Sequence, residues 1–317
     1  MKKRMGAVQA GVFFLLFFPL TACSINKMAV KAVSNALTGE GSSAVFTGDS
    51  DLVLVGDALP FAIKMYESLL AANPNHQGLI LTTGSLFVMY ANAFVQAPAE
   101  FLPVEQYEER QASLERARRL YLRGADILYG GLEKKYPRIA GEGAAATLAR
   151  MTRADVPLLY WTAAGYLAAY SLNPFDLQLG SRVPDLMSWI NRAYELDPDF
   201  NHGALDEFYI TALSALPESI GGDKTRAELH FQRALEKSGG LLAGPYVSYA
   251  QSVLIPTQDY GAFKAMLEKA LSLDVDADPP NRLVNILAQK KARLLLETAA
   301  DYFLETEDEP EDDEREG

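Results

Sequence analysis

The stretch LMSWINRAYELDPD, residues 186–199, sets the pattern for the rest of the chain. Leu186, Ile190 and Ala193 recur at the spacing of one helix face and therefore predict an apolar stripe. The helix should end at Asp197-Pro198, because proline cannot continue a helix and disfavours helical geometry in the residue before it. We predict an amphipathic helix with a small residue, Ala193, close to a defined stop.

The same pattern returns twice further along the chain. Ala234 lies near the end of a second stripe before Gly239-Gly240, and Ala270 lies near the end of a third before Asp278-Pro279. The three alanines are 41 and then 36 residues apart, and tetratricopeptide (TPR) units repeat about every 34 residues. In such arrays a small residue lets the neighbouring helix approach closely. The sequence predicts an all-α fold, a helical array of degenerate TPR-like helix pairs.

Composition limits the classes of function. The chain has 317 residues, 49% of them hydrophobic and 22% charged, which is the profile of an ordinary globular protein. Its formal net charge is −12, and the acidic balance argues against a nucleic-acid partner, since phosphate binding needs clustered lysine and arginine. The single cysteine, Cys23, leaves no intramolecular disulfide and no cysteine-based zinc site.

The N-terminus has the pattern of a secretory signal. Residues 2–4 are basic, residues 11–20 are almost wholly apolar, and Leu20-Thr21-Ala22-Cys23 resembles a lipobox. An ordinary signal peptide followed by an incidental cysteine is the alternative. We favour lipidation of Cys23, because the only cysteine lies at that position. This predicts a covalent lipid on Cys23, no other cofactor, and a location on the periplasmic face of a bacterial membrane.

Four segments follow from these patterns. Residues 1–22 are the predicted signal peptide, and residues 23–50 are the lipidated cysteine and a tether. Residues 51–304 are the predicted all-α domain. Residues 305–317 contain nine acidic residues and form a predicted disordered tail.

The motifs of known catalytic and metal sites are missing from the sequence. It contains no His-Glu-x-x-His and no phosphate-binding Gly-x-x-x-x-Gly-Lys-Ser/Thr, so we predict neither a metal site nor a nucleotide site. His202 and Asp206 are four residues apart, which on a helix would place them on one face as a general-base pair. A polar cluster at a helix start is the plainer interpretation. We predict a protein that is not an enzyme.

Aromatic and amide residues are the candidates for a groove. Tyr160 and Trp161 lie on the predicted first helix of a pair, and the first helices of a TPR-like array line its concave face. Asn285 and Gln289 share a helix face. Buried amides need hydrogen-bond partners, so this pair either bonds a neighbouring helix, which we favour, or bonds a ligand. The predicted ligand or partner groove comprises Tyr160, Trp161, His202, Asp206, Asn285 and Gln289.

Four motifs together resemble one family, the T component of TPR-associated tripartite ATP-independent periplasmic (TRAP) transporters, TatT. They are PLLYWTAA from Pro157, LDPDFNHGALDEF from Leu196, AELHFQRAL from Ala227 and RLVNILAQKKARLLL from Arg282. The resemblance extends from the lipobox to about residue 304.

The resemblance implies a periplasmic lipoprotein that forms a homotrimer. It also implies an internal pore or cleft, a hydrophobic or organic-acid ligand, and binding to the substrate-binding P component of the transporter. Two alternatives stay open. One is a TPR scaffold lipoprotein for envelope protein assembly, and the other is a hydrolase that uses His202 and Asp206.

Overall fold

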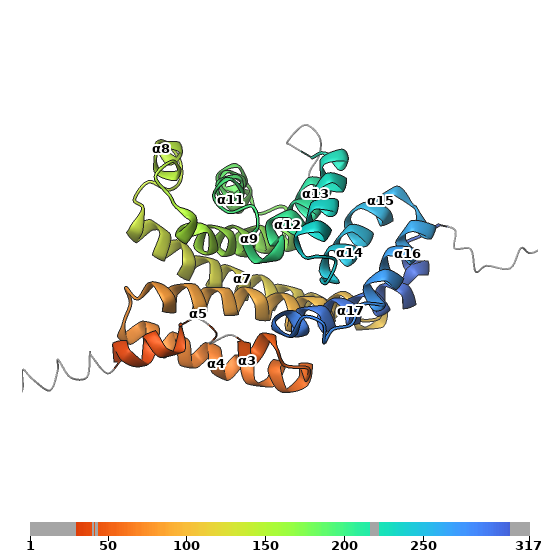
Figure 1. Ribbon diagram of the computed structural model, residues 1–317, viewed down its shortest axis with the longest axis horizontal. Helices are drawn as coiled ribbons and strands as arrows, with labels where there is room; N and C mark the ends of the chain where they lie inside the picture. The colour runs from red at the N-terminus through yellow and green to blue at the C-terminus, as the bar shows by residue number, and fades with distance from the viewer. Residues whose placement is uncertain (1–29, 40, 42–43, 216–221, 305–317) are drawn as a thin grey trace, which may run out of the picture.

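The computed structural model describes residues 30–39, 41, 44–215 and 222–304 (Figure 1). All regular structure in these ranges is helical, and they contain no strand. The all-α prediction is therefore confirmed. The predicted signal peptide, Cys23 and the acidic tail from residue 305 onward lie outside the described residues.

The N-terminal half is a stack of long helices. Helix α5 packs between α4 and α7, and α7 packs in turn against α9. Leucine, alanine and tyrosine side chains from these helices form most of the buried contacts. The elements are a helix at residues 30–37, α3 Ala44–Thr47, α4 Leu52–Ala72, α5 Gln77–Tyr90, η1 Ala91–Gln96, α6 Ala97–Glu100, η2 Val104–Gln106, α7 Tyr107–Lys135, α8 Ala144–Leu148, η3 Arg153–Asp155 and α9 Val156–Leu172.

The C-terminal half is built from shorter helices in which sequence neighbours pack together. Helix α12 packs on α13, and α16 packs on α14 and α17. The predicted helix pairs are thus neighbours in space, while their classification as TPR units stays a prediction. The elements are α10 Leu177–Gly180, α11 Val183–Leu196, η4 Phe200–His202, α12 Ala204–Ala215, α13 Lys224–Lys237, α14 Gly244–Tyr249, η6 Ala250–Leu254, α15 Ile255–Thr257, α16 Tyr260–Leu271, η7 Pro279–Asn281, α17 Arg282–Glu297 and η8 Ala299–Asp301.

The small residues of the repeat pattern lie at close helix contacts. Ala193, Ala234 and Ala270 each have no exposed surface. A Cβ atom at Gly203, just before α12, would lie 3.2 Å from the Cα of Ala234. The backbone entering α12 therefore lies against α13, which a larger side chain at Ala234 would prevent.

The decisive stretch forms α11 and ends as the sequence predicts. The helix stops at Leu196, and the backbone N–H of Asp197 donates to the carbonyl of Ala193. The Asp197 carboxylate then pairs with the guanidinium of Arg153, 2.8 Å away. The residue that ends α11 thus forms an ion pair with η3, the turn that precedes α9.

The last long helix returns to the first ones. Helix α17 contacts both α3 and α4 (Figure 1), and the guanidinium Nη1 of Arg282 donates to the carbonyl of Gly48 at 2.7 Å. Tyr66 on α4 donates to the carbonyl of Leu37 at 2.9 Å. The packed part of the chain thus extends N-terminally beyond the predicted boundary at residue 51, and its two ends meet.

One helix in the described ranges, Gln77–Glu100, is long and apolar enough to cross a membrane by length and composition alone. It comprises α5, η1 and α6. Because α5 packs between α4 and α7, and η1 also packs on α7, this apolar segment is a core helix of the fold.

Candidate ligand site

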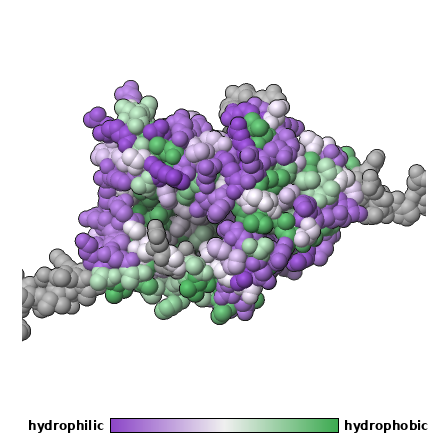
Figure 2. Space-filling model, in the orientation of Figure 1, coloured by the Kyte–Doolittle hydropathy of each residue, from purple (hydrophilic) through white to green (hydrophobic). Residues whose placement is uncertain are grey.

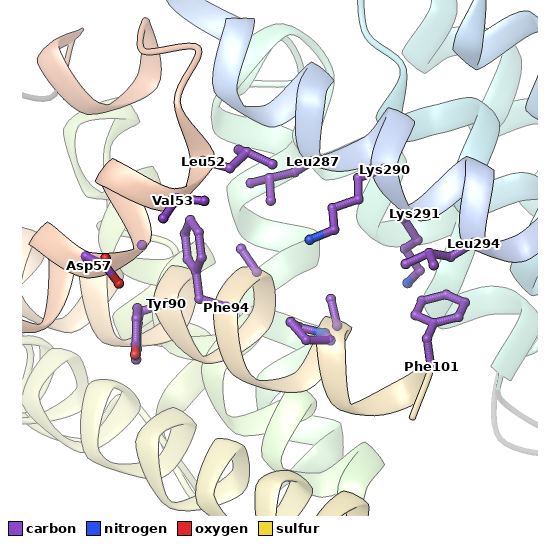
Figure 3. A pocket seen from close by; sticks show the side chains of 14 residues that line it. Leu52, Val53, Asp57, Tyr90, Phe94, Phe101, Leu287, Lys290, Lys291 and Leu294 are labelled. Atoms are coloured by element: carbon purple, nitrogen blue, oxygen red, sulfur yellow. The ribbon is translucent and has the colours of Figure 1, made fainter. Parts of the chain in front are cut away.

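A pocket lies at the seam where the two ends of the array meet (Figure 3). It is enclosed by Leu52–Asp57 of α4, by Tyr90–Phe101, and by Leu287–Leu294 of α17, and we call it the seam pocket. Its cavity volume is about 280 Å³, close to the lower end of small-molecule sites. Leucine, phenylalanine and alanine side chains make up half of its wall, and Val53 and Pro98 add further apolar surface.

A π-helical turn shapes one wall of the seam pocket. Element η1 interrupts the α-helical hydrogen bonding after Tyr90, and such turns are common at functional sites. Phe94 extends from this turn towards α4. A Cβ atom at Gly56 would lie 2.9 Å from the Phe94 ring. Glycine at position 56 therefore makes room for the aromatic wall.

The charged groups of the seam pocket are unequally distributed. Lys290 and Lys291 lie on α17, while Asp57 lies at the other end (Figure 3). The ammonium of Lys291 is 3.7 Å from the carboxylate of Glu100, and Lys290 forms no ion pair within the described ranges. Apolar walls beside an unpaired ammonium group suit a molecule with a hydrophobic body and an anionic head.

A carboxylate, Glu207 of α12, lies within the electrostatic influence of Lys291, one of the residues that line this pocket. The hydroxyl of Ser248 donates to Oε1 of Glu207 at 2.9 Å, and a Cβ at Gly244 would lie 2.7 Å from the same oxygen. Burial raises the pKa of Glu207, and the hydroxyl of Ser248 and the charge of Lys291 partly offset this. Part of the Glu207 side chain stays accessible although it lies deep among protein atoms.

The predicted aromatic pair lies on α9, where Tyr160 is within the electrostatic influence of Glu207. Tyr160 and Trp161 on α9 are half-buried and pack edge to face, with ring centroids 5.1 Å apart, and Tyr160 also contacts Phe200 at 5.3 Å. Burial raises the pKa of Tyr160, and the charge of Glu207 adds to the effect. The surface recedes near the middle of the view in Figure 2. A groove role for Tyr160 and Trp161 stays a prediction.

The structure does not bring His202 and Asp206 together as a general-base pair. Asn201 and His202 have φ angles of 45° and 56°, and α12 begins only at Ala204. His202 is therefore exposed and lies off the helix face of Asp206. Asp206 does belong to a polar cluster near the start of α12, as the plainer interpretation predicts, but His202 forms no hydrogen bond to it and its partners are other residues. No group of three or more metal-ligating side chains occurs in the described ranges.

Asp206 instead belongs to a buried cluster with His230, Lys237 and Tyr194, the Asp206 cluster. Its Oδ1 lies 2.7 Å from Nδ1 of His230 and accepts from the hydroxyl of Tyr194 at 3.0 Å. Its Oδ2 accepts from the ammonium of Lys237 at 2.7 Å. Burial acts to raise the pKa of Asp206, but the bonds from His230 and Lys237 outweigh it and hold the pKa below its ordinary value. The carboxylate is thus fully bonded inside the chain.

Asn285 and Gln289 form hydrogen bonds within the chain, the alternative that the sequence favoured: Asn285 bonds the segment before α14, and Gln289 bonds the end of α16. The Asn285 amide accepts from the backbone N–H of Ala243 and donates to the carbonyl of Leu241, both at 2.9 Å. The Gln289 amide nitrogen donates to carbonyls at the end of α16, the shortest bond being 2.8 Å to Leu273. These amides hold α17 onto α14 and α16, and their contact with a ligand stays an untested prediction.

Sequence reasoning missed the residues of the seam pocket. Lys290 and Lys291 follow Gln289 directly, but the sequence pattern marks only the buried face of their helix. Glu207 adjoins Asp206 in the sequence and has no motif of its own that predicts a site. The pairing of Gly56 with Phe94 has no local signal, because it depends on a contact between two helices.

Residues 48–303 match the TRAP transporter T-component family, and the chain belongs to that family. A protein of Treponema pallidum (strain Nichols), described only as an uncharacterized protein, is 36% identical over 302 residues. The alignment covers 89% of this chain and 94% of the relative. Family membership makes the chain an accessory component of a bacterial membrane transport system that faces the periplasm.

Proposed function

We propose that this protein binds the periplasmic substrate-binding P component of a TRAP transporter and holds a hydrophobic organic anion in the seam pocket. The family match over residues 48–303 carries the first part. The apolar wall, with Lys290 unpaired at its edge, supports the second. The protein acts by binding and transfer, a role that the match to an accessory transport component supports.

The same proposal includes an anchor. A lipid on Cys23 would hold the chain at the periplasmic face of the membrane, where the P component reaches it. Six residues lie between Cys23 and Val30, the first described residue, and the seven Cα–Cα steps of such a segment span at most about 25 Å. The array would therefore stay close to the membrane surface.

A pull-down from detergent-solubilised cells tests the partner. The lipidated chain carries a C-terminal tag, and bound proteins are identified and quantified. We expect a periplasmic solute-binding protein in an amount close to one per chain. Recovery of envelope assembly factors without a solute-binding protein would instead support the scaffold alternative and contradict the transporter proposal.

The variant Cys23→Ser tests the anchor separately. We expect it to leave the membrane fraction, because the lipid supplies the binding free energy at the bilayer. Fractionation followed by immunoblotting measures the change, with the wild-type chain as the reference. Retention of Cys23→Ser in washed membranes would exclude the lipid as the anchor.

A further inference from the structure

One side of α4 is apolar and exposed, where a surface helix is normally polar. Leu54 and Phe61 are 59% and 76% exposed, and the half-buried Met65 follows one turn after Phe61. These residues are seven and then four positions apart, which places them on one side of the helix over about 16 Å. We call them the α4 stripe. The core residues Leu59 and Ile63 lie on the other side, so Leu54 and Phe61 are not required for packing within the chain.

The α4 stripe is separate from the seam pocket and offers no unpaired charge at its rim. From α4 the pocket takes residues such as Val53 and Asp57, and no residue of the α4 stripe lines it. Lys64, beside the stripe, is paired with Glu67 at 2.6 Å. A surface of this kind is covered by an apolar partner through contact area and not through charge pairing.

The N-terminal segment joins the body of the protein next to α4. The hydroxyl of Tyr66 on α4 donates to the carbonyl of Leu37 at 2.9 Å, and Oδ1 of Asn35 lies 2.8 Å from Nε2 of His76, just after α4. The first described helix is thereby fixed to α4, and its Val33 is 48% exposed. Figure 1 shows this helix and α4 along the lower edge of the molecule, and Figure 2 shows hydrophobic side chains along the same edge.

We propose that the α4 stripe and Val33 insert into the surface of the lipid bilayer that holds the chain, an inference that rests on the lipid anchor proposed at Cys23. Six residues lie between Cys23 and Val30, so the first described helix starts within about 25 Å of the anchored cysteine. An exposed apolar helix side at that distance lies in the interface, its side chains about 5–10 Å deep at the boundary of headgroups and acyl chains.

The charge of the protein selects the kind of lipid contact. With a formal net charge of −12 the chain gains nothing from anionic headgroups, so apolar side chains in the acyl region supply the contact. A zwitterionic phosphatidylcholine surface is therefore sufficient. The contact fixes the orientation of the array, with α4 towards the membrane. Because α4 also forms a wall of the seam pocket, that pocket lies near the bilayer surface.

Hydroxyl-radical footprinting of the lipidated chain in phosphatidylcholine vesicles tests this contact. Phe61 and Phe175 are 76% and 90% exposed, so Phe175 is a control of the same residue type in the same molecule. Compared with the Cys23→Ser chain in solution, oxidation of Phe61 should fall more than about threefold, since insertion withdraws the ring from water. Oxidation of Phe175 should stay the same. An equal fall at the two residues, or no fall at Phe61, overturns the proposal.

The variant Leu54→Glu keeps Phe61 as the reporter and places a charge in the α4 stripe. It should restore the oxidation of Phe61 in vesicles, whereas Leu177→Glu, at a leucine that is 85% exposed, should not. Circular dichroism verifies that both variants are folded. Equal behaviour of the two variants contradicts insertion of the α4 stripe. So does a Phe61 that is already protected relative to Phe175 in the Cys23→Ser chain, because a second copy would then cover it without lipid.

Intact mass and flotation with the vesicles report the anchor separately. A chain without acyl groups contradicts the anchor and the membrane contact together. An acylated chain that floats with the vesicles while its Phe61 stays fully oxidised contradicts the membrane contact alone. The pull-down of the P component has its own readout and does not depend on either result.

Discussion

The Asp206 cluster and the seam pocket both contain charged groups near apolar side chains, but they differ in whether the charges are partnered. In the cluster, the Asp206 carboxylate has three partners within 3.0 Å and no exposed surface. In the pocket, Lys290 forms no ion pair within the described ranges. A buried charge without a partner is costly, so the partnered charges of the Asp206 cluster serve to stabilise the fold. An unpartnered charge beside an apolar hollow is available to a ligand.

The largest expected effect is the loss of stability when the Asp206 cluster is broken. Asp206→Ala leaves Lys237 and His230 without the carboxylate that they share. Removing one partner of a buried charge pair costs about 3–5 kcal/mol. Urea denaturation should show that loss in the free energy of unfolding. Lys290→Gln is the control, and it should alter stability by less than about 0.5 kcal/mol. A loss below about 1 kcal/mol for Asp206→Ala would contradict a stabilising role of the Asp206 cluster.

A second variant tests the close packing beside the Asp206 cluster. Ala234→Phe forces a ring into the contact between α13 and the backbone at Gly203, and overpacking of this kind costs about 1–3 kcal/mol. Thermal and urea denaturation measure it. Ala265→Phe, at an exposed position of α16, is the matched control and should leave the melting temperature nearly unchanged. Equal melting temperatures for the two variants would contradict the close approach.

The two interior carboxylates predict opposite dependences of stability on pH. The pKa of Glu207 is raised above 4.5, so its contribution is present below that value and is lost as the pH rises through the raised pKa. The pKa of Asp206 is lowered below 3.8, so its contribution is present above that value and is lost as the pH falls through the lowered pKa. Urea midpoints measured from about pH 3 to 8 should show both limbs.

The variant Glu207→Gln isolates the upper limb of that profile. Because glutamine does not titrate, the variant should lose the decline on the alkaline side and keep the acid limb that Asp206 produces. A variant whose whole profile coincides with that of the wild-type chain would show that Glu207 is well solvated. It would then not face an enclosed interior.

The smallest expected effect is on ligand affinity at the seam pocket. Lys290→Gln should weaken binding of octanoate, a medium-chain carboxylate, by about two- to fivefold, because an exposed charge pair contributes only about 0.2–1 kcal/mol. Titration calorimetry measures the affinity. Octanol is the uncharged probe, and its affinity should not change. Lys269→Gln is the control for general charge effects. An equal loss for octanol and octanoate would show that Lys290 does not select an anionic head.

The sequence predicted helices better than it predicted sites. The apolar stripe, Ala193 and the Asp197-Pro198 stop are local signals, and α11 follows them closely. His202 and Asp206 show where such reasoning fails. Their spacing brings them together only on a continuous helix, and the positive φ angles at residues 201 and 202 delay the helix to residue 204.

The residues of the seam pocket could not be found from local pattern at all. Its walls come from residues 52–57 and 287–294, which are more than 200 residues apart in the chain. Lys290 looks like an ordinary solvated lysine until α17 is placed against α4. Asn285 and Gln289 were recognisable because a buried amide needs a partner, which is a requirement of the residue type.

The bond between Arg282 and Gly48 also has a consequence for how the protein is made. It joins residues 234 positions apart, so the loop that it closes includes most of the chain. During synthesis Gly48 is present long before Arg282, and contacts of such separation form slowly. The seam pocket is therefore completed last, and a partly made or C-terminally shortened chain would lack it. The ligand binding proposed for the seam pocket would then require that the whole array has been assembled.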